Sequence, residues 1–198
     1  TGTAGSGGAL FNNASTVTIT NSTFTANTSN RAGGAIEALA GTTTLNDVTM
    51  ASNDAGTAPG NGGGLHVSGA GTVLMNGGFA RRNRAVEGGG LWCSVACTMT
   101  ITNGDIQGNV ATGGAEATQG GGGLYNDGAL TVVDSRIIGN RASSTTGTLG
   151  SGGGILNVGG TLTVTSSRLQ ANEAARAGGG SPGAGAGAAG PAPAAARA

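Results

Sequence analysis

Charged residues are scarce in this 198-residue chain: they make up 9% of it, and lysine is absent. Nine arginines balance nine acidic residues, so the formal net charge is zero. Because nucleic acid and anionic membrane surfaces are bound through clustered positive charge, the composition predicts neither partner. No apolar run approaches the roughly 20 residues that cross a bilayer as a helix, so no transmembrane helix is predicted.

The residues on which most catalytic and metal sites depend are also few. The chain has one histidine, His66, and two cysteines, Cys93 and Cys97. A Ser-His-Asp triad or a histidine-based metal cluster therefore lacks a set of partners, and the acidic residues are scattered along the chain. We predict no catalytic residues, no metal site and no cofactor.

Glycine is abundant, with 43 residues, and most of it belongs to a repeated pattern. Each repeat has a glycine pair or triplet before an aliphatic residue, then an apolar-x-apolar pair, then an apolar residue shortly before an asparagine. The aliphatic residues after the glycines are Leu10, Ile36, Leu65, Leu91, Leu124 and Ile155. Their spacing of about 26 to 33 residues indicates one solenoid of about six coils.

The apolar pairs have a period of two and are rich in β-branched residues, which predicts strands. We expect three short strands per coil, stacked in parallel to form an all-β parallel β-helix. In the third coil the pattern predicts Phe79 as the inward residue of the last strand. Phe79 lies four positions before Asn83, one more than in the other coils, so a bulge at Gly77 and Gly78 is expected.

One asparagine per coil is predicted to stack at a single corner and to bond bent backbone there. These residues are Asn27, Asn53, Asn83, Asn109, Asn140 and Asn172. A polar binding groove is the alternative interpretation of this column. Insertions at 54–61, 112–120 and 143–151 are expected to form loops along one edge. The β-helix is predicted to span 1–177, followed by a disordered Gly/Ala/Pro-rich tail at 178–198.

The residue after each inward aliphatic should point outward, because side chains alternate along a strand. This column contains Phe11, Glu37, His66, Trp92, Tyr125 and Leu156. We expect Trp92 and Tyr125 to be solvent-exposed neighbours, and we regard Phe11, His66, Trp92 and Tyr125 as candidate ligand-binding residues that could stack on sugar rings. Aromatic residues tolerated on a β surface are the alternative.

Cys93 and Cys97 flank a predicted turn that could bring them within reach of a disulfide, which export would favour. Two buried free thiols are the alternative.

A second outward array lies on the middle strand of each coil, where threonine recurs at alternate positions. Its members are Thr16, Thr18, Thr20, Thr42, Thr44, Thr98, Thr100, Thr102, Thr161, Thr163 and Thr165. Such Thr-x-Thr ranks resemble those of ice-binding β-helices, which makes ice binding one alternative function. Leu74, Asn76, Ala129 and Val133 interrupt the grid, and threonine favours exposed strands for its β propensity alone.

The segments GGAL at 7–10, GGAI at 33–36 and FTAN at 24–27 carry a resemblance to a known family. They resemble the GGA(I/L/V) and FxxN repeats of the polymorphic outer-membrane proteins, which are bacterial autotransporters. The resemblance covers residues 7–177. It implies a right-handed β-helix of pectate-lyase-like architecture, export, and display at the bacterial cell surface through a part outside this sequence.

The resulting hypothesis is a non-catalytic exported segment that binds surface glycans or cell-surface proteins as an adhesin or passenger. Neither end has the apolar residues for a cap, so end-to-end self-association is also expected.

The alternative is a fragment of a carbohydrate-active β-helix enzyme, a polysaccharide lyase or hydrolase, whose catalytic coils lie elsewhere. Asp47 and Asp134 share a predicted corner column with Asn21, Asn76, Asn103 and Ser166. Three coils separate the two carboxylates, about 14 Å at the strand spacing, so they are too far apart to share a calcium ion. The basic cluster of Arg81, Arg82 and Arg84 is interpreted as a solvated face and not as a catalytic base.

Overall fold

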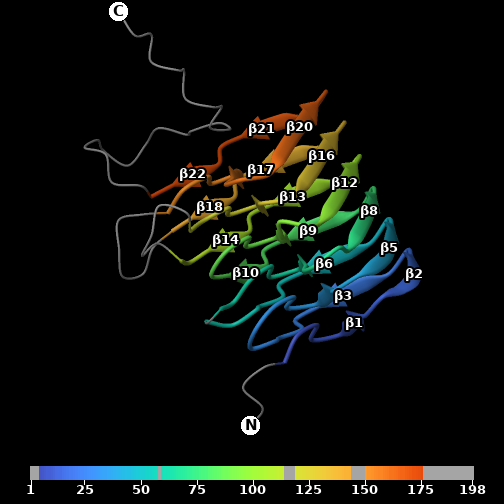
Figure 1. Cartoon of the computed structure of the whole chain (residues 1–198). Helices are drawn as coiled ribbons and strands as arrows, with labels where there is room; N and C mark the ends of the chain where they lie inside the picture. Colours follow the sequence, from blue (N-terminus) through green and yellow to red (C-terminus); the bar gives the residue numbers. More distant parts are fainter. Residues whose placement is uncertain (1–4, 58, 114–118, 144–149, 176–198) are drawn as a thin grey trace, which may run out of the picture.

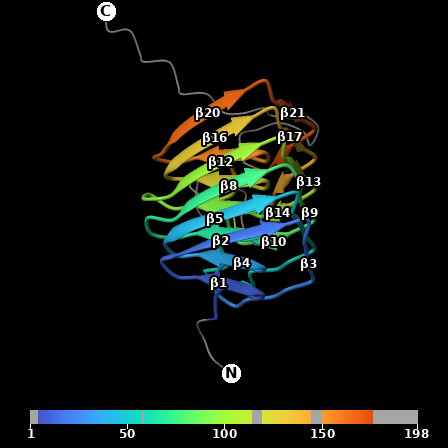
Figure 2. The same cartoon turned by 90° about the vertical axis from the view of Figure 1, so that its right-hand side faces the viewer.

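The computed structural model describes residues 5–57, 59–113, 119–143 and 150–175. These residues form an all-β parallel β-solenoid of about five turns, with no helix among them. Each strand pairs in parallel with its counterparts in the neighbouring coils, so the strands form ladders along one axis (Figure 1 and Figure 2). The predicted parallel stacking of three strands per coil is confirmed.

Three six-stranded sheets line the coil. Sheet 1 contains β1 (Leu10–Asn12), β4 (Ile36–Ala38), β7 (Leu65–Val67), β11 (Leu91–Cys93), β15 (Leu124–Asn126) and β19 (Ile155–Asn157). Sheet 2 contains β2 (Ser15–Thr20), β5 (Gly41–Asn46), β8 (Thr72–Asn76), β12 (Thr98–Thr102), β16 (Ala129–Val133) and β20 (Thr161–Thr165). Sheet 3 contains β3 (Thr23–Thr25), β6 (Thr49–Ala51), β9 (Phe79–Arg81), β13 (Asp105–Gln107), β17 (Arg136–Ile138) and β21 (Arg168–Gln170).

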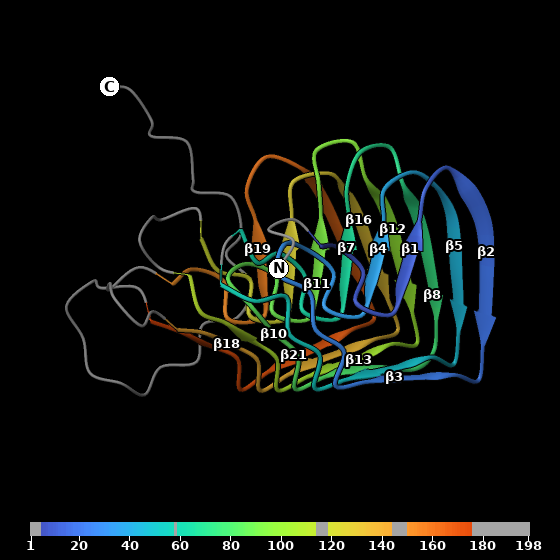
Figure 3. The same ribbon diagram turned by 90° about the horizontal axis from the view of Figure 1, so that it is seen from below.

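A fourth, short sheet was not predicted from the sequence. Sheet 4 contains β10 (Arg84–Ala85), β14 (Val110–Ala111), β18 (Arg141–Ala142) and β22 (Glu173–Ala174). Its strands are two residues long, which is too short for a period-two pattern to be recognised. Seen along the stack in Figure 3, sheet 2 lies at one side of the coil, sheet 3 follows it, and sheet 4 leads away from sheet 3.

The core fills the interior with the columns predicted from the repeat. The sheet 1 column runs in register through Leu10, Ile36, Leu65, Leu91, Leu124 and Ile155. Sheet 2 contributes two inward residues per strand, as with Met99 and Ile101, which are fully buried. Each such side chain contributes about 1.5–3 kcal/mol through burial. The inner coils are the most tightly closed, since Ile19 and Leu162 in the first and last coils are only partly buried.

The third coil corrects one prediction. Ala80, not Phe79, is the inward residue of β9, because it pairs in register with Met50 and Ile106. Ala80 is 0% exposed and Phe79 is 40% exposed. The coil has no extra residue at this corner, so the expected bulge is absent. Ala80 stands three positions before Asn83, as in the other coils, and this constant spacing turns the larger Phe79 outward.

The asparagine corner explains why this spacing is kept. Each asparagine from Asn27 to Asn140 donates two hydrogen bonds to the asparagine of the next coil. Its backbone N–H and its Nδ2 both donate to the side-chain oxygen of that residue, at 2.9–3.0 Å. From Asn53 to Asn172, each Nδ2 also donates to the backbone oxygen of the inward sheet 3 residue one coil earlier, for example from Asn109 to Ala80 at 2.8 Å. We call this continuous chain the asparagine ladder.

The loops and the end of the chain are described only in part. Residues 58, 114–118 and 144–149, in the centres of the three predicted insertions, lie outside the described residues. The predicted disordered tail at 178–198 also lies outside them.

The asparagine ladder predicts a large effect for Asn109→Leu. The change leaves the backbone N–H and Nδ2 of Asn83 without their acceptor in a buried site, which costs about 1–3 kcal/mol for each unsatisfied group. Chemical denaturation measures the loss. Gln107→Leu is the matched control, since Gln107 is exposed in the same coil, and equal stability of the two variants would contradict a structural role for the ladder.

The corrected register predicts opposite results for two alanine substitutions in sheet 3. Ile137→Ala should lower the free energy of unfolding by about 2–5 kcal/mol, because it opens a cavity in the core. Phe79→Ala should change it by only about 0.5 kcal/mol, as for other surface positions. Thermal melting of both variants checks this. A cost for Phe79→Ala as large as that of Ile137→Ala would place Phe79 inside.

Candidate functional site

The outward column of sheet 1 is in register across all six strands, in the order Phe11, Glu37, His66, Trp92, Tyr125 and Leu156. Three of its rings form a continuous stack. The ring centroids of His66 and Trp92 are 4.4 Å apart with an interplanar angle of 22°, and those of Trp92 and Tyr125 are 5.2 Å apart at 11°. The predicted neighbours are therefore adjacent, and parallel strand pairing is what aligns them.

The expected solvent exposure of this column is wrong for its centre. His66 is 7% exposed and Tyr125 8%, and Trp92 is half-buried, whereas Phe11 in the first coil is 51% exposed. The rings cover one another, and the turn before each strand adds further cover. Gly88, with φ of +58°, lies so close to the strand that a Cβ there would be 2.9 Å from the Cβ of Trp92. A sugar ring would find the faces of this stack already occupied.

The polar end of the column is a buried cluster. The Oε2 atom of Glu37 lies 2.6 Å from Nδ1 of His66, and the hydroxyl of Ser68 donates to Oε1 of the same carboxylate. Ser68 thus bonds to the carboxylate and not to the imidazole, so these residues do not form the nucleophile–base pair of an acyl-transfer triad. The carboxylate instead fixes the orientation of the imidazole against the indole of Trp92.

Cys93 and Cys97 form a disulfide with Cα atoms 5.4 Å apart, within the range such bonds require. Cys93 is buried at the end of β11, and the bond closes the corner between sheet 1 and sheet 2. Within the closed loop, Val95 is 77% exposed. The bond therefore holds an aliphatic side chain in solvent.

Among the described residues, no group of three or more His, Cys, Asp and Glu side chains could hold a metal ion. Asp47 and Asp134 occupy the positive-φ corner after sheet 2, with φ of 50° and 48°. The structure corrects one member of this corner column: Gly77, with φ of +72°, takes the place predicted for Asn76, which is instead a strand residue paired with Asn46.

The three arginines of the basic cluster, Arg81, Arg82 and Arg84, are exposed. The guanidinium of Arg81 lies 5.4 Å from the ring centroid of Phe79, and Arg84 is 3.4 Å from Asp54. Arg82 is at a positive-φ corner. These are surface contacts, in line with the predicted solvated face.

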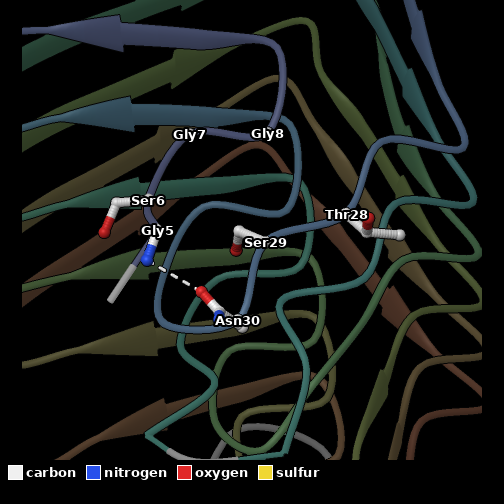
Figure 4. A pocket seen from close by; sticks show the side chains of 7 residues that line it. All are labelled: Gly5, Ser6, Gly7, Gly8, Thr28, Ser29 and Asn30. Atoms are coloured by element: carbon white, nitrogen blue, oxygen red, sulfur yellow. Dashed lines mark hydrogen bonds between the residues drawn. The ribbon is translucent and has the colours of Figure 1, made fainter. Parts of the chain in front are cut away.

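One cavity of about 420 Å³ lies beside the first coil (Figure 4). Its lining is Gly5, Ser6, Gly7, Gly8, Thr28, Ser29 and Asn30. The backbone N–H of Gly5 donates to the side-chain oxygen of Asn30 at 2.7 Å across it. The lining has no ionisable side chain to orient a charged ligand.

The outer face of sheet 2 is more regular than the sequence suggested. Its three outward columns hold 13 threonines in 18 positions. The first column is Thr16, Thr42, Thr72, Thr98, Ala129 and Thr161. The second is Thr18, Thr44, Leu74, Thr100, Thr131 and Thr163. The third is Thr20, Asn46, Asn76, Thr102, Val133 and Thr165. We call this surface the threonine face.

Thr72 and Thr131 were missed in the sequence pattern. Each of them is the single threonine among the three outward residues of its strand, so no Thr-x-Thr pattern occurs within that strand. Aligning the strands by their inward pairs, such as Val73 and Met75, would have found Thr72. Regularity across coils is visible only once the register is known.

Comparison of the chain with known protein families, curated proteins and solved structures found no match. In the part of the chain that the structure describes, no helix is long and apolar enough to cross a membrane.

The buried position of Tyr125 predicts a pH effect. Burial, with smaller contributions from Glu87 and Asp127, raises the pKa of this phenol from 10.0 to about 12. The unfolded chain releases the proton near pH 10, so it binds fewer protons than the folded chain above that pH, and stability falls as the pH rises towards 12. The loss is at most about 2–3 kcal/mol, because solvent screening weakens the effect of burial on the phenolate.

Tyrosinate absorbance reports this titration directly, because Tyr125 is the only tyrosine. The folded chain should titrate near pH 12 and the denatured chain near 10. Tyr125→Phe should remove this part of the alkaline loss of stability. A folded chain that titrates near 10 would show that Tyr125 is exposed to solvent.

Proposed function

We propose that this chain is an exported right-handed β-helix that acts by binding at a surface, as a displayed passenger or adhesin segment. The proposal follows the resemblance of its GGA(I/L) and FxxN repeats to those of polymorphic outer-membrane proteins. Repeats of this kind specify an architecture more strongly than a ligand, so the contact surface has to be argued from the faces of the solenoid.

The observation that carries the binding role is the threonine face. The outer faces of sheets 1 and 3 carry ionisable side chains such as Glu37, Asp105 and Arg136, whereas none of the 18 outward positions of sheet 2 is ionisable. The face extends over six strands in register. A broad, ordered and uncharged surface favours contact with an extended partner over the enclosure of a small substrate.

The disulfide supports the export part of the proposal. Such bonds form and persist in oxidising compartments and are rare where glutathione keeps thiols reduced. Both cysteines of the chain are used in the one bond. The aromatic stack contributes less than the sequence suggested, because the faces of its rings are occupied by one another.

Thiol trapping in cells of the source organism tests export and display. An externally added protease should remove the chain from intact cells, and Cys93 and Cys97 should resist alkylation until a reductant is added. A protease-protected chain with two reactive thiols would contradict export. Cells with the protease added after lysis provide the control for its activity.

Incubation with polygalacturonate and calcium tests the alternative of a polysaccharide lyase. We expect no unsaturated product from the purified chain, because its described carboxylates do not converge. Unsaturated product above that of the heat-denatured chain would contradict a role in binding only.

A further inference from the structure

We propose that the threonine face binds crystalline ice, which makes ice the ligand of the surface-binding role proposed above. The inference rests on the proposed function in one respect: both take the threonine face as the surface that makes contact. It follows from three properties of sheet 2: the two-dimensional spacing of its side chains, their chemistry, and the rigidity of the strands that carry them.

The spacing is that of a grid. Neighbouring strands lie about 4.8 Å apart, and alternate residues on one strand lie about 6.6 Å apart. Because the six strands pair without a shift, these intervals repeat across the whole face, as in the run from Thr16 to Thr42 to Thr72. The planes of hexagonal ice repeat their oxygen atoms at similar intervals in two directions. Only a partner whose own groups repeat at matching intervals could contact all positions of such a grid at once.

The side chains suit water held in a lattice. Each threonine presents one hydroxyl and one methyl group, and its branched Cβ restricts χ1, so that neighbouring residues on a strand hold their groups in few orientations. Hydroxyls can join the hydrogen bonds of the lattice, and methyl groups can fill its openings. The absence of ionisable groups from the 18 positions matters here, because a charge orders water around itself instead.

The same chemistry argues against other extended partners. Nucleic acids and acidic polymers are recognised by clustered arginine and lysine, and sugars by the open faces of aromatic rings. The 18 outward positions of sheet 2 offer neither.

The strands are also held rigidly from behind. The inward residues of the inner strands, such as Val73, Met99 and Ile101, are buried in the core. Figure 2 shows the strands of sheet 2 side by side along the stack. At the end of these strands, Nδ2 of Asn76 donates to the side-chain oxygen of Asn46 at 2.9 Å, which fixes two of the non-threonine members of the grid. A surface fixed before binding loses little entropy when it meets a crystal.

Leu74 is the main irregularity of the grid. It lies in the middle of the second column between Thr44 and Thr100, and its larger side chain is exposed. Ala129 and Val133 are smaller departures that still present methyl groups. If the grid is what binds, replacing Leu74 with threonine should improve binding, which few other roles for this surface would predict.

The test measures the incorporation of the fluorescently labelled chain into a slowly growing ice hemisphere, together with thermal hysteresis. The unmodified chain should be enriched in ice and should shape the crystals. Thr100→Arg, in the middle of the face, should lose most of both effects, and Leu74→Thr should increase the hysteresis. Gln107→Arg, on the exposed side of sheet 3 in the same coil as Thr100, is the matched control and should leave both unchanged. Circular dichroism and thermal melting establish that each variant is folded.

Exclusion of the unmodified chain from ice, with no shaping of crystals, would overturn the inference. Full activity of a folded Thr100→Arg would overturn the assignment to the threonine face. In a third outcome, the chain binds crystalline cellulose or chitin, Thr100→Arg abolishes this binding, and the chain is not enriched in ice. This result would show that the threonine face binds a polysaccharide and would contradict ice as its ligand. A chain that does not bind ice could still be accessible to protease on intact cells and have its two cysteines oxidised. Failure of the ice-binding proposal is therefore distinguishable from failure of the proposed export.

Discussion

The hydrogen bonds of the asparagine ladder are the interaction on which the rest of the structure depends. Each link between coils uses a side-chain oxygen as a double acceptor, and Nδ2 reaches the backbone oxygen of the inward sheet 3 residue one coil earlier, as from Asn140 to Ile106. From Asn53 onward the bonds between asparagines are buried, so a shift between coils would leave donors unpaired in the interior. Hydrophobic columns alone would tolerate some sliding, because one aliphatic residue packs much like another. The ladder removes that freedom, and the register it sets aligns both the core and the outer faces.

Because the asparagine ladder constrains the register more strongly than the hydrophobic columns do, some parts of the structure could be predicted from the sequence and others could not. The columns from Leu10 to Ile155 could be predicted because apolar period and glycine spacing agree there. In the third coil the two signals disagree, and the spacing to Asn83 outweighs the greater hydrophobicity of Phe79. The outward direction of Trp92 and Tyr125 was predictable from alternation, but their burial was not. It arises from contacts between coils and from a turn that approaches each strand, neither of which a single strand's pattern contains.

The solenoid separates the residues that stabilise it from those free to contact a partner. Inward positions are constrained by the core and corner positions by the ladder, so the chemistry of each outer face can vary independently. The faces differ accordingly. Sheet 1 carries a closed stack of rings beside Glu37, sheet 3 carries the ion pair of Arg136 with the half-buried Asp105 at 3.3 Å, and sheet 2 carries uncharged residues alone. A face without charge on a chain with few charges would be unremarkable if its residues were random, but these repeat in register over six strands.

The disulfide has a consequence for how the molecule would respond to mechanical load. Cys93 and Cys97 are four residues apart in sequence and belong to one coil, so the bond joins no coil to another. A force that peels coils from the end of the stack would meet only hydrogen bonds and packed side chains, released one coil at a time. When the fourth coil opens, the chain would lengthen by a few residues less than it would without the covalent bond, because the loop between Cys93 and Cys97 stays closed. The rod would therefore yield in steps, and a reducing environment would change the length of one step and not the strength of the stack.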